Sequence, residues 1–235
     1  MSTHDDLSFA VEKFSGIARL FPLPNMALFP HVMQPLHVFE RRYRDLLEDA
    51  IHDDQLITMA VLAPGWERDY EGRPALYPMA CVGRITVHYR LADGTYNLLL
   101  LGLRRVRLLH ELTPLKTFRE AEVELCEDDY STCSLAHQQT LRQDLRKALL
   151  QILPALPETQ EQLEQLLGNN VSLGILTDVV SYMLDIDMAR KQLMLGEVDV
   201  QRRAQLLLSY LSEVAVDSIA CKAEALCFPP HFSAN

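Results

Sequence analysis

The spacing of hydrophobic residues changes near residue 130, and this change divides the chain into two halves. Before it, short apolar runs alternate with polar positions and are interrupted by proline and glycine. A period of two is typical of β-strands, whose successive side chains point to opposite faces. After it, apolar residues recur every three or four positions, as on one face of a helix. The pattern predicts a β-rich first half and an all-helical second half.

The first half contains at least five candidate strands and one candidate helix. The helix is expected over residues 40–50. Asp93-Gly94 predicts a tight hairpin turn, because glycine accepts the positive φ angles that such turns need. Gly102 predicts a bulge or bend between two strands. The strands are expected at 56–62, 81–89, 95–101, 104–110 and 118–125. Consecutive strands with a bend favour a small barrel or a strongly curved sheet.

The second half places capping residues in front of its helical patterns. Ser134, Ser172 and Asp199 each precede an apolar stripe, and such side chains accept hydrogen bonds from the first turn of a helix. Two further short helices are expected over 158–167 and 189–195. Several short amphipathic helices imply a compact bundle.

These patterns predict an α+β protein with two subdomains. The 235 residues are enough to bury a real core. We expect an N-terminal tail over 1–17 and a β-rich subdomain over 18–126. A helical subdomain over 127–227 and a C-terminal tail over 228–235 complete the division.

Charge is distributed unevenly between the two halves. Residues 14–125 hold 13 Lys/Arg and 14 Asp/Glu, whereas residues 126–235 hold 8 and 15. The whole chain has a net charge of −10. An acidic half repels phosphate backbones, so nucleic-acid binding by the whole chain is disfavoured. The basic run Arg104, Arg105 and Arg107 leaves a local RNA-binding alternative open.

The cysteines and the N-terminus indicate the cellular compartment of the protein. Five cysteines form no CxxC pair, and an odd number argues against a disulfide framework. The first residues lack the pattern of a signal peptide, and no apolar run reaches the length of a membrane helix. We therefore expect reduced thiols, a cytoplasmic protein and no membrane contact.

Particular residues resemble a known family. The stretches 21–24 and 28–30 read Phe-Pro-Leu-Pro and Leu-Phe-Pro, and 93–107 follows the pattern DGT…GLxRxR. The stretch 176–181, Leu-Thr-Asp-Val-Val-Ser, and the pair at 202–203 are similar to the helical part of the same family. Over about residues 18–215, the chain resembles the N-terminal substrate-binding domain of Lon proteases.

The resemblance implies a PUA-like β barrel with a short helix, followed by a helical bundle. It also implies recognition of unfolded or degron-bearing polypeptides. The chain is similar to free-standing bacterial forms without ATPase or peptidase domains. An adaptor or substrate-binding factor in proteolysis or protein quality control is expected, with a separate ATP-dependent protease as a candidate partner. The oligomeric state stays open.

Catalytic motifs are missing from the sequence. No lysine follows a glycine, so a phosphate-binding GK[ST] loop is excluded. Neither GxSxG nor HExxH occurs. We therefore expect no catalysis, no cofactor and no metal. A small-molecule-binding protein or a cryptic enzyme remains the alternative.

The candidate polypeptide-binding residues combine aromatic rings with arginine, the residue types that concentrate binding energy at interfaces. Those in the loop between two predicted strands could instead fold back as a lid over the barrel. Those on the predicted strand at 104–110 could instead pair with neighbouring acids. The candidates are Trp66, Arg68, Tyr70 and Arg73 in the loop, and Arg104 and Arg105 on the strand.

Overall fold

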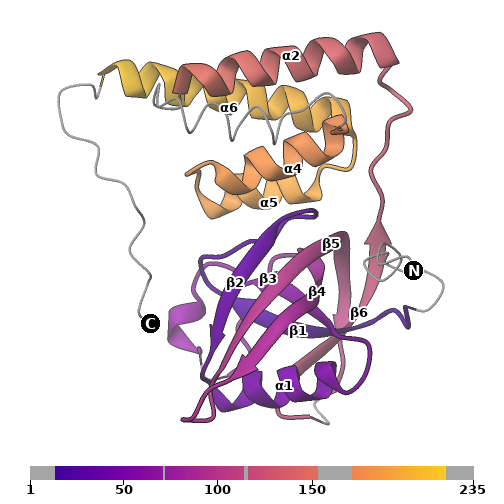
Figure 1. Cartoon of the computed structure of the whole chain (residues 1–235), viewed down its shortest axis with the longest axis vertical. Coiled ribbons are helices and arrows are strands. Elements are labelled where there is room, and N and C mark those ends of the chain that lie inside the picture. Colours follow the sequence, from indigo (N-terminus) through magenta and orange to yellow (C-terminus); the bar gives the residue numbers. More distant parts are fainter. Residues whose placement is uncertain (1–13, 71, 114–115, 153–170, 221–235) are drawn as a thin grey trace.

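The computed structural model describes residues 14–70, 72–113, 116–152 and 171–220. A sheet occupies one side of the molecule, and a layer of helices lies above it (Figure 1). A further helix, α1, lies at the opposite end of the sheet. The class is α+β, as the hydrophobic pattern predicted.

The described elements agree with the predicted order from residue 40 onwards, apart from one strand in place of two over 95–110, but strands at 17–23 and 33–38 were not among those predicted. The strands are β1 Ile17–Leu23, β2 Met33–Val38, β3 Leu56–Val61, β4 Met79–Arg90, β5 Tyr96–Glu111 and β6 Arg119–Cys126. The helices are α1 Arg41–Ile51, α2 Leu135–Ile152, α4 Leu173–Met183, α5 Met188–Gly196 and α6 Val200–Ala220, with a 3-10 turn at Trp66–Arg68. The helix expected over 158–167 lies outside the described residues. The subdomain boundaries stay a prediction.

Pairing closes five of the strands on themselves. The order is β2-β5-β4-β3-β1-β6, and β6 also pairs with β5. The strands β1, β3, β4, β5 and β6 therefore form a closed ring, which we call the strand ring. Within it, β1 and β3 run parallel and the other neighbours antiparallel. Strand β2 lies outside the ring, paired with β5 alone among the described strands. Whether this ring is PUA-like stays a prediction.

The inside of the strand ring is packed with small and medium apolar side chains. One buried cluster draws only on the five ring strands: Ala18, Leu20, Leu56, Ala60, Ala80, Val82, Leu103, Val106, Ala121 and Val123. Alternate residues of each strand face inward, and four alanines leave the space that a narrow ring requires. A larger cluster lies outside the ring, against α1 and the helical layer.

Gly102 does not end a strand, and the prediction of two strands over 95–101 and 104–110 was wrong. Strand β5 runs through this position as one element of 16 residues. Val82 pairs with Arg104 but Gly83 pairs with Gly102, so Leu103 is the extra residue of a β-bulge. A Cβ at Gly102 would collide with the carbonyl oxygen of Phe29. The predicted bulge is therefore confirmed, and it bends β5 so that it pairs with β2 at one end and β6 at the other.

The predicted hairpin is also confirmed. Strands β4 and β5 pair antiparallel up to Arg90 and Tyr96, on either side of Asp93-Gly94. Gly94 has φ +83°, a backbone conformation that residues other than glycine rarely adopt.

The helices start where the capping residues predicted. Ser172 accepts a hydrogen bond from the backbone N–H of Ile175 at 3.2 Å, and Asp199 accepts from Gln201 at 2.9 Å. Ser134 caps α2 in the same way. Helix α1 buries one face against β1 and β3, and α5 contacts β4 from the helical layer. Within the described residues, no helix is long and apolar enough to cross a membrane.

Candidate functional site

A cavity of about 250 Å³ opens between α1, the loop that follows β3 and the start of β6. Its wall comes from four separate parts of the chain, which the closed strand ring brings together. Among the residues that the structure describes, those that line it include no acidic side chain: Pro22, Arg42, Tyr43, Leu62, Tyr70, Gly72, Arg73, Pro74, Lys116, Thr117, Phe118 and Arg119.

One side of the cavity is an arginine held between two aromatic rings. The Arg42 guanidinium lies 4.7 Å from the ring centroid of Tyr43 and 4.8 Å from that of Tyr70. Glu40 accepts hydrogen bonds from Arg42 Nε at 3.0 Å and from the Tyr70 hydroxyl at 2.8 Å. Cation–π contact and the ion pair together hold the guanidinium plane in position.

On another side of the cavity, two arginines share a single carboxylate. Glu111 Oε2 accepts from Arg73 Nη2 at 2.6 Å and from Arg119 Nε at 2.9 Å. Burial alone would raise the pKa of Glu111, but the hydrogen bonds and charges of Arg119 and Arg73 outweigh it and lower the pKa. Glu111 is therefore ionised at neutral pH.

Lys116 completes the cationic lining. Its ammonium lies 2.9 Å from Asp49 and 3.1 Å from Glu120. Burial opposes its charge, but the hydrogen bonds to these two carboxylates prevail and raise its pKa. The cavity therefore presents four cations, while their acidic partners lie outside the lining.

The predicted loop residues lie in and beside this cavity. Tyr70 and Arg73 line it. Trp66 is half-buried and packs edge-on against Tyr70, with the ring centroids 5.6 Å apart. Arg68 is exposed beside them. The structure thus gathers Trp66, Tyr70 and Arg73 into one region.

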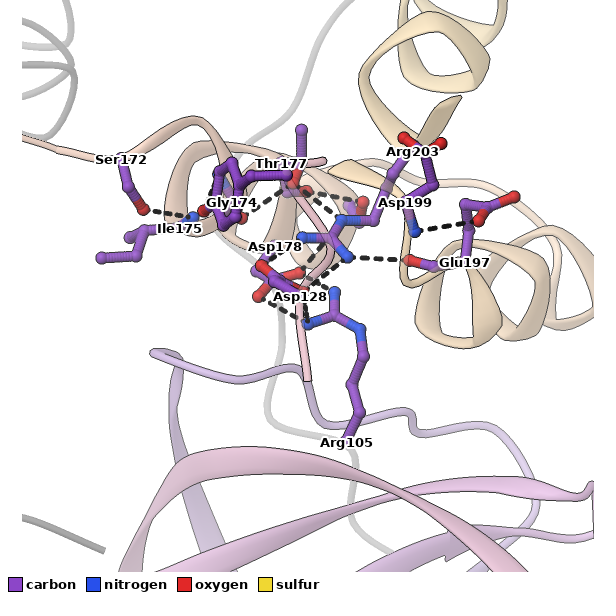
Figure 2. Close-up of polar contacts among 12 residues, drawn as sticks. Arg105, Asp128, Ser172, Gly174, Ile175, Thr177, Asp178, Glu197, Asp199 and Arg203 are labelled. Carbon is purple, nitrogen blue, oxygen red and sulfur yellow. Dashed lines mark hydrogen bonds and ion pairs between the residues drawn. The ribbon is translucent and has the colours of Figure 1, made fainter. Parts of the chain in front are cut away.

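The predicted strand residues Arg104 and Arg105 lie elsewhere. Arg105 is only 3% exposed, because it points from β5 into the interface with the helical layer (Figure 2). Its Nη1 donates to Asp128 and to Asp178, each at 3.1 Å. The side chain of Arg105 is therefore taken up by contacts within the chain, and it has no surface to offer a polypeptide. Arg104 is half-buried and bonds the carbonyl of Leu103.

Arg203 of α6 joins the same contacts. Its Nη1 and Nη2 donate to the two carboxylate oxygens of Asp128 at 2.9 and 2.8 Å, and its Nε lies 3.7 Å from Asp178. We call Arg105, Asp128, Asp178 and Arg203 the buried ion cluster. It joins β5, the segment after β6, α4 and α6 (Figure 2).

Burial and charge act in opposite directions in this cluster. Desolvation would raise the pKa of Asp128, but Arg203 and Arg105 outweigh it and hold the pKa below its usual range. Asp178 is fully buried, and desolvation raises its pKa against the opposing charges of both arginines. Two arginines and two aspartates balance each other, which is the condition for keeping charges inside a protein.

The remaining arginine of the basic run pairs with a neighbouring acid and is not part of a binding surface. Arg107 is exposed and pairs with Glu124 on the neighbouring strand at 3.1 Å. With Arg105 buried and Arg107 paired, the run does not form an exposed basic strip. The RNA-binding alternative therefore loses the feature on which it rested.

The chain as a whole matches a known family. A family model described as the ATP-dependent protease La (LON) substrate-binding domain matches residues 17–213. The chain belongs to the Lon substrate-binding domain family. Lon protease 2 of Myxococcus xanthus is 28% identical over 201 residues, which cover 86% of this chain and 24% of that protein. Lon protease of Anaeromyxobacter dehalogenans is 26% identical over the same coverage. The chain thus spans about a quarter of the length of these relatives.

Solved structures agree with this membership. The crystal structure of a Lon N-terminal domain protein from Xanthomonas campestris has a TM-score of 0.60 and 25% identity, covering 83% of this chain and 98% of that one. The N-terminal domain of the Mycobacterium avium complex Lon protease has a TM-score of 0.65 and 17% identity, covering 84% and 98%. The latter likeness shows the fold alone.

Several residues that line the cavity of this Lon-family chain could not be predicted from the sequence. Arg42, Lys116 and Arg119 were not predicted, because they are far apart in sequence and no motif joins them. The buried ion cluster did leave a signal. Arg203 follows Val200 by three positions and precedes Leu207 by four, so it falls on the apolar face of α6. A charge on such a face indicates a buried partner.

Burial raises the pKa of all three cysteine thiols that the structure describes, Cys81, Cys126 and Cys133. Burial raises the pKa of the Cys81 thiol to about 12, so it stays protonated. Within residues 14–70, 72–113, 116–152 and 171–220, no three His, Cys, Asp or Glu side chains group as metal ligands would.

Proposed function

We propose that this chain recognises polypeptides through the loop after β3 and the adjoining cavity. The observation that carries the proposal is the wall that Trp66, Tyr70 and Arg42 form beside the cavity. Aromatic rings offer large contact area at low entropy cost, and arginine adds directed hydrogen bonds, so such walls are typical of binding hot spots. Membership of a family described as substrate-binding supports the same conclusion. Arg68 and Arg73 extend this surface.

A second feature supports polypeptide binding. The outer face formed by β2, β5 and β4 exposes apolar side chains, with Met33 49% and Tyr89 66% exposed. Val87 of β4 joins them, and Phe39 just beyond β2 is 46% exposed. Apolar side chains that are exposed together on one face mark interaction surfaces, whereas single exposed apolar residues are common on any protein. In this proposal, the face contacts a further part of the bound polypeptide.

We extend the proposal to the type of barrel and bundle in this chain and to its role in the cell. The strand ring corresponds to a PUA-like barrel, and α2, α4, α5 and α6 to its helical bundle. The chain acts without catalysis of its own, as a cytoplasmic adaptor or substrate-binding factor in proteolysis or protein quality control. Unfolded or degron-bearing polypeptides are its ligands, and an ATP-dependent protease receives them.

The test compares the unfolded and native forms of one model protein. The first form is reduced and alkylated, and binding of both to this chain is measured by fluorescence anisotropy. We expect the unfolded form to bind and the native form to bind at least about 10-fold more weakly. Tyr70→Ala should weaken binding of the unfolded form by about 10-fold, since hot-spot truncations cost on the order of 1–2 kcal/mol or more.

The matched control is Arg202→Ala in the helical layer, an exposed residue far from the cavity in sequence and outside its lining. This control should leave binding unchanged. Equal binding of both forms, or no binding of either, would rule out the proposal.

A further inference from the structure

Strands β4 and β5 extend beyond the strand ring, and β2 pairs with their extension. Strand β3 pairs with β4 only as far as Arg84, whereas β2 pairs with β5 from Leu101 to Tyr96. Side chains of directly paired residues point to the same side of a sheet. We call one side of this extension the wing face. Its apolar residues, which share this side by register, are Met33, Pro35, Leu99, Leu101, Val87 and Tyr89.

The wing face is exposed, in contrast to the opposite side of the same strands. Met33 is 49% and Val87 39% exposed, and Leu99 is half-buried. On the opposite side, Leu36 and Leu98 belong to the buried cluster that packs against α1. The described residues therefore leave the wing face open, although most of its side chains are apolar.

The chain enters the structure where the wing face begins. Phe14, the first described residue, packs against the buried cluster inside the strand ring, and so does Leu101 at the near end of the wing face. The Gly16 carbonyl accepts a hydrogen bond from the backbone N–H of Val123 at 2.9 Å, which aligns the entering chain with the end of β6. That end pairs with Arg105 of β5, four positions from Leu101. The segment that precedes Phe14 therefore starts beside the wing face.

Residues 1–13 precede the described part of the chain, and their sequence has a pattern that suits this surface. Leu7, Phe9 and Val11 alternate with small residues. In an extended chain, such alternation places all three apolar side chains on one side. A segment with one apolar side matches a sheet surface that exposes apolar side chains.

The charges of the two partners are opposite. Strands β2 and β4 and residues 96–101 of β5 contain no Asp or Glu, and Arg84 and His37 lie on the wing face by register. Residues 1–13 contain three acids and one lysine, and so carry a net charge of −2. Opposite charges favour the approach of the segment to the face. The three acids are Asp5, Asp6 and Glu12.

The segment is long enough to reach the far end of the wing face. Residues 7–13 span at most about 25 Å when extended. From Arg84 to Tyr89, β4 advances by about 17 Å. Covalent attachment through a short linker gives such a segment an effective concentration on the order of millimolar. A second copy or an external polypeptide at a much lower concentration competes poorly against it.

We propose that residues 5–12 of this chain dock on the wing face. Leu7, Phe9 and Val11 face the apolar side chains of β2, β5 and β4, and the acids lie toward Arg84. The inference goes beyond the proposed function, because the occupant belongs to this chain and needs no external ligand. A polypeptide that contacts the same face must displace the segment.

The experiment is photo-cross-linking of the full chain carrying Phe9→p-benzoylphenylalanine. The chain is illuminated at low concentration, and the products are mapped by gel electrophoresis and mass spectrometry. We expect cross-links within one chain to peptides that contain Met33, 84–89 or 97–101. Cross-linked dimers whose yield rises with protein concentration would assign the face to a second copy and overturn the inference. Cross-links to the helical layer alone, or none within the chain, would also overturn it.

The neighbouring position supplies the matched control. Ser8 points to the opposite side from Phe9 in an extended segment, so Ser8→p-benzoylphenylalanine should cross-link to the wing face with a several-fold lower yield. Equal yields from the two positions would contradict the alternating contact on which the inference depends.

A variant of the face itself tests the other partner. Val87→Asp removes an apolar contact and adds a charge that repels the acidic segment, so the yield from the probe at position 9 should fall several-fold. Leu193→Asp on α5, another exposed apolar position, should leave this yield unchanged. Thermal melting verifies that both variants fold. A yield that survives Val87→Asp would place the segment elsewhere and overturn the inference.

These measurements use no added polypeptide. Failure of the intramolecular cross-link would therefore refute this inference and leave the proposed function standing. Absence of binding to unfolded protein would refute the proposed function alone, because docking of residues 5–12 requires no external ligand.

Discussion

The buried ion cluster and the cavity use the same residue types for different purposes. In the cluster, Arg105 and Arg203 face Asp128 and Asp178 between the strand ring and the helical layer. In the cavity, arginines line an open space and their acidic partners lie behind it. The cluster encloses its ion pairs inside the protein, whereas the ion pairs of the cavity lie beside an open space that a ligand can enter.

This contrast shows that burial and charge balance determine what an arginine does. A balanced, buried group has no donor left over, so it positions the two layers relative to each other. A partly exposed arginine such as Arg73 lies where a ligand can reach its side chain.

Asp178→Ala should have the largest effect. It would leave Arg105 and Arg203 with only Asp128 for charge balance in a dry interface. Breaking a buried pair typically costs about 3–5 kcal/mol, so we expect a loss of this size in the free energy of unfolding. Urea titration followed by circular dichroism measures it. Asp144→Ala on α2 is the matched control, because its carboxylate is 47% exposed. A loss below about 1 kcal/mol would show that the cluster is not structural.

Replacing both members of a buried pair should cost less than replacing one. We compare the double variant Arg105→Met with Asp178→Leu against Asp178→Ala alone. Apolar groups of similar size leave no uncompensated charge in the pair, although Arg203 then relies on Asp128. We expect the double variant to be more stable than Asp178→Ala by about 1–2 kcal/mol. A double variant that is less stable than Asp178→Ala would indicate that the pair itself stabilises the interface.

Acid should weaken the contribution that Asp128 makes to the cluster, whereas the raised pKa of Asp178 acts in the opposite direction. The folded-state pKa of Asp128 is lowered, so its contribution is present above the unfolded pKa of about 4. This contribution is lost as the pH falls through the folded value, because the unfolded state then binds more protons. We therefore expect the contribution of this group to the free energy of unfolding to decrease as the pH falls below about 4. Asp128→Asn should flatten that part of the pH profile, and an unchanged profile would contradict the assignment.

Arg73→Ala should affect stability least. The pair with Glu111 is partly exposed, and such pairs contribute about 0–1 kcal/mol. We expect a change in the free energy of unfolding below about 1 kcal/mol, measured by urea titration beside Asp178→Ala. A loss comparable to that of Asp178→Ala would remove the distinction between cavity and cluster.

Several elements could be predicted because their causes are local. Asp93-Gly94 needs positive φ and alternating neighbours to form a hairpin, and both stand next to each other in the chain. Ser172 and Asp199 cap helices through bonds to residues within three positions. The DGT…GLxRxR stretch indicated the family for the same reason, since its pattern is contiguous.

The binding residues were predicted only in part. Trp66, Tyr70 and Arg73 share one loop, so their residue types could be read together. Arg42 and Arg119 reach the same cavity from α1 and β6, and nothing in the sequence joins them. Arg105 had the appearance of a binding residue because its partner Asp178 lies 73 positions away.

The sequence by itself determined the division into a β-rich half and a helical half, the caps, the hairpin, the bulge at Gly102 and the family. Each depends on backbone conformation or periodicity within a few residues. Only the tertiary structure decided which arginines are buried and which line the cavity. The reason is that charge compensation acts through space: closure of the strand ring and docking of the helical layer enclose some arginines with distant carboxylates and leave others beside an open cavity.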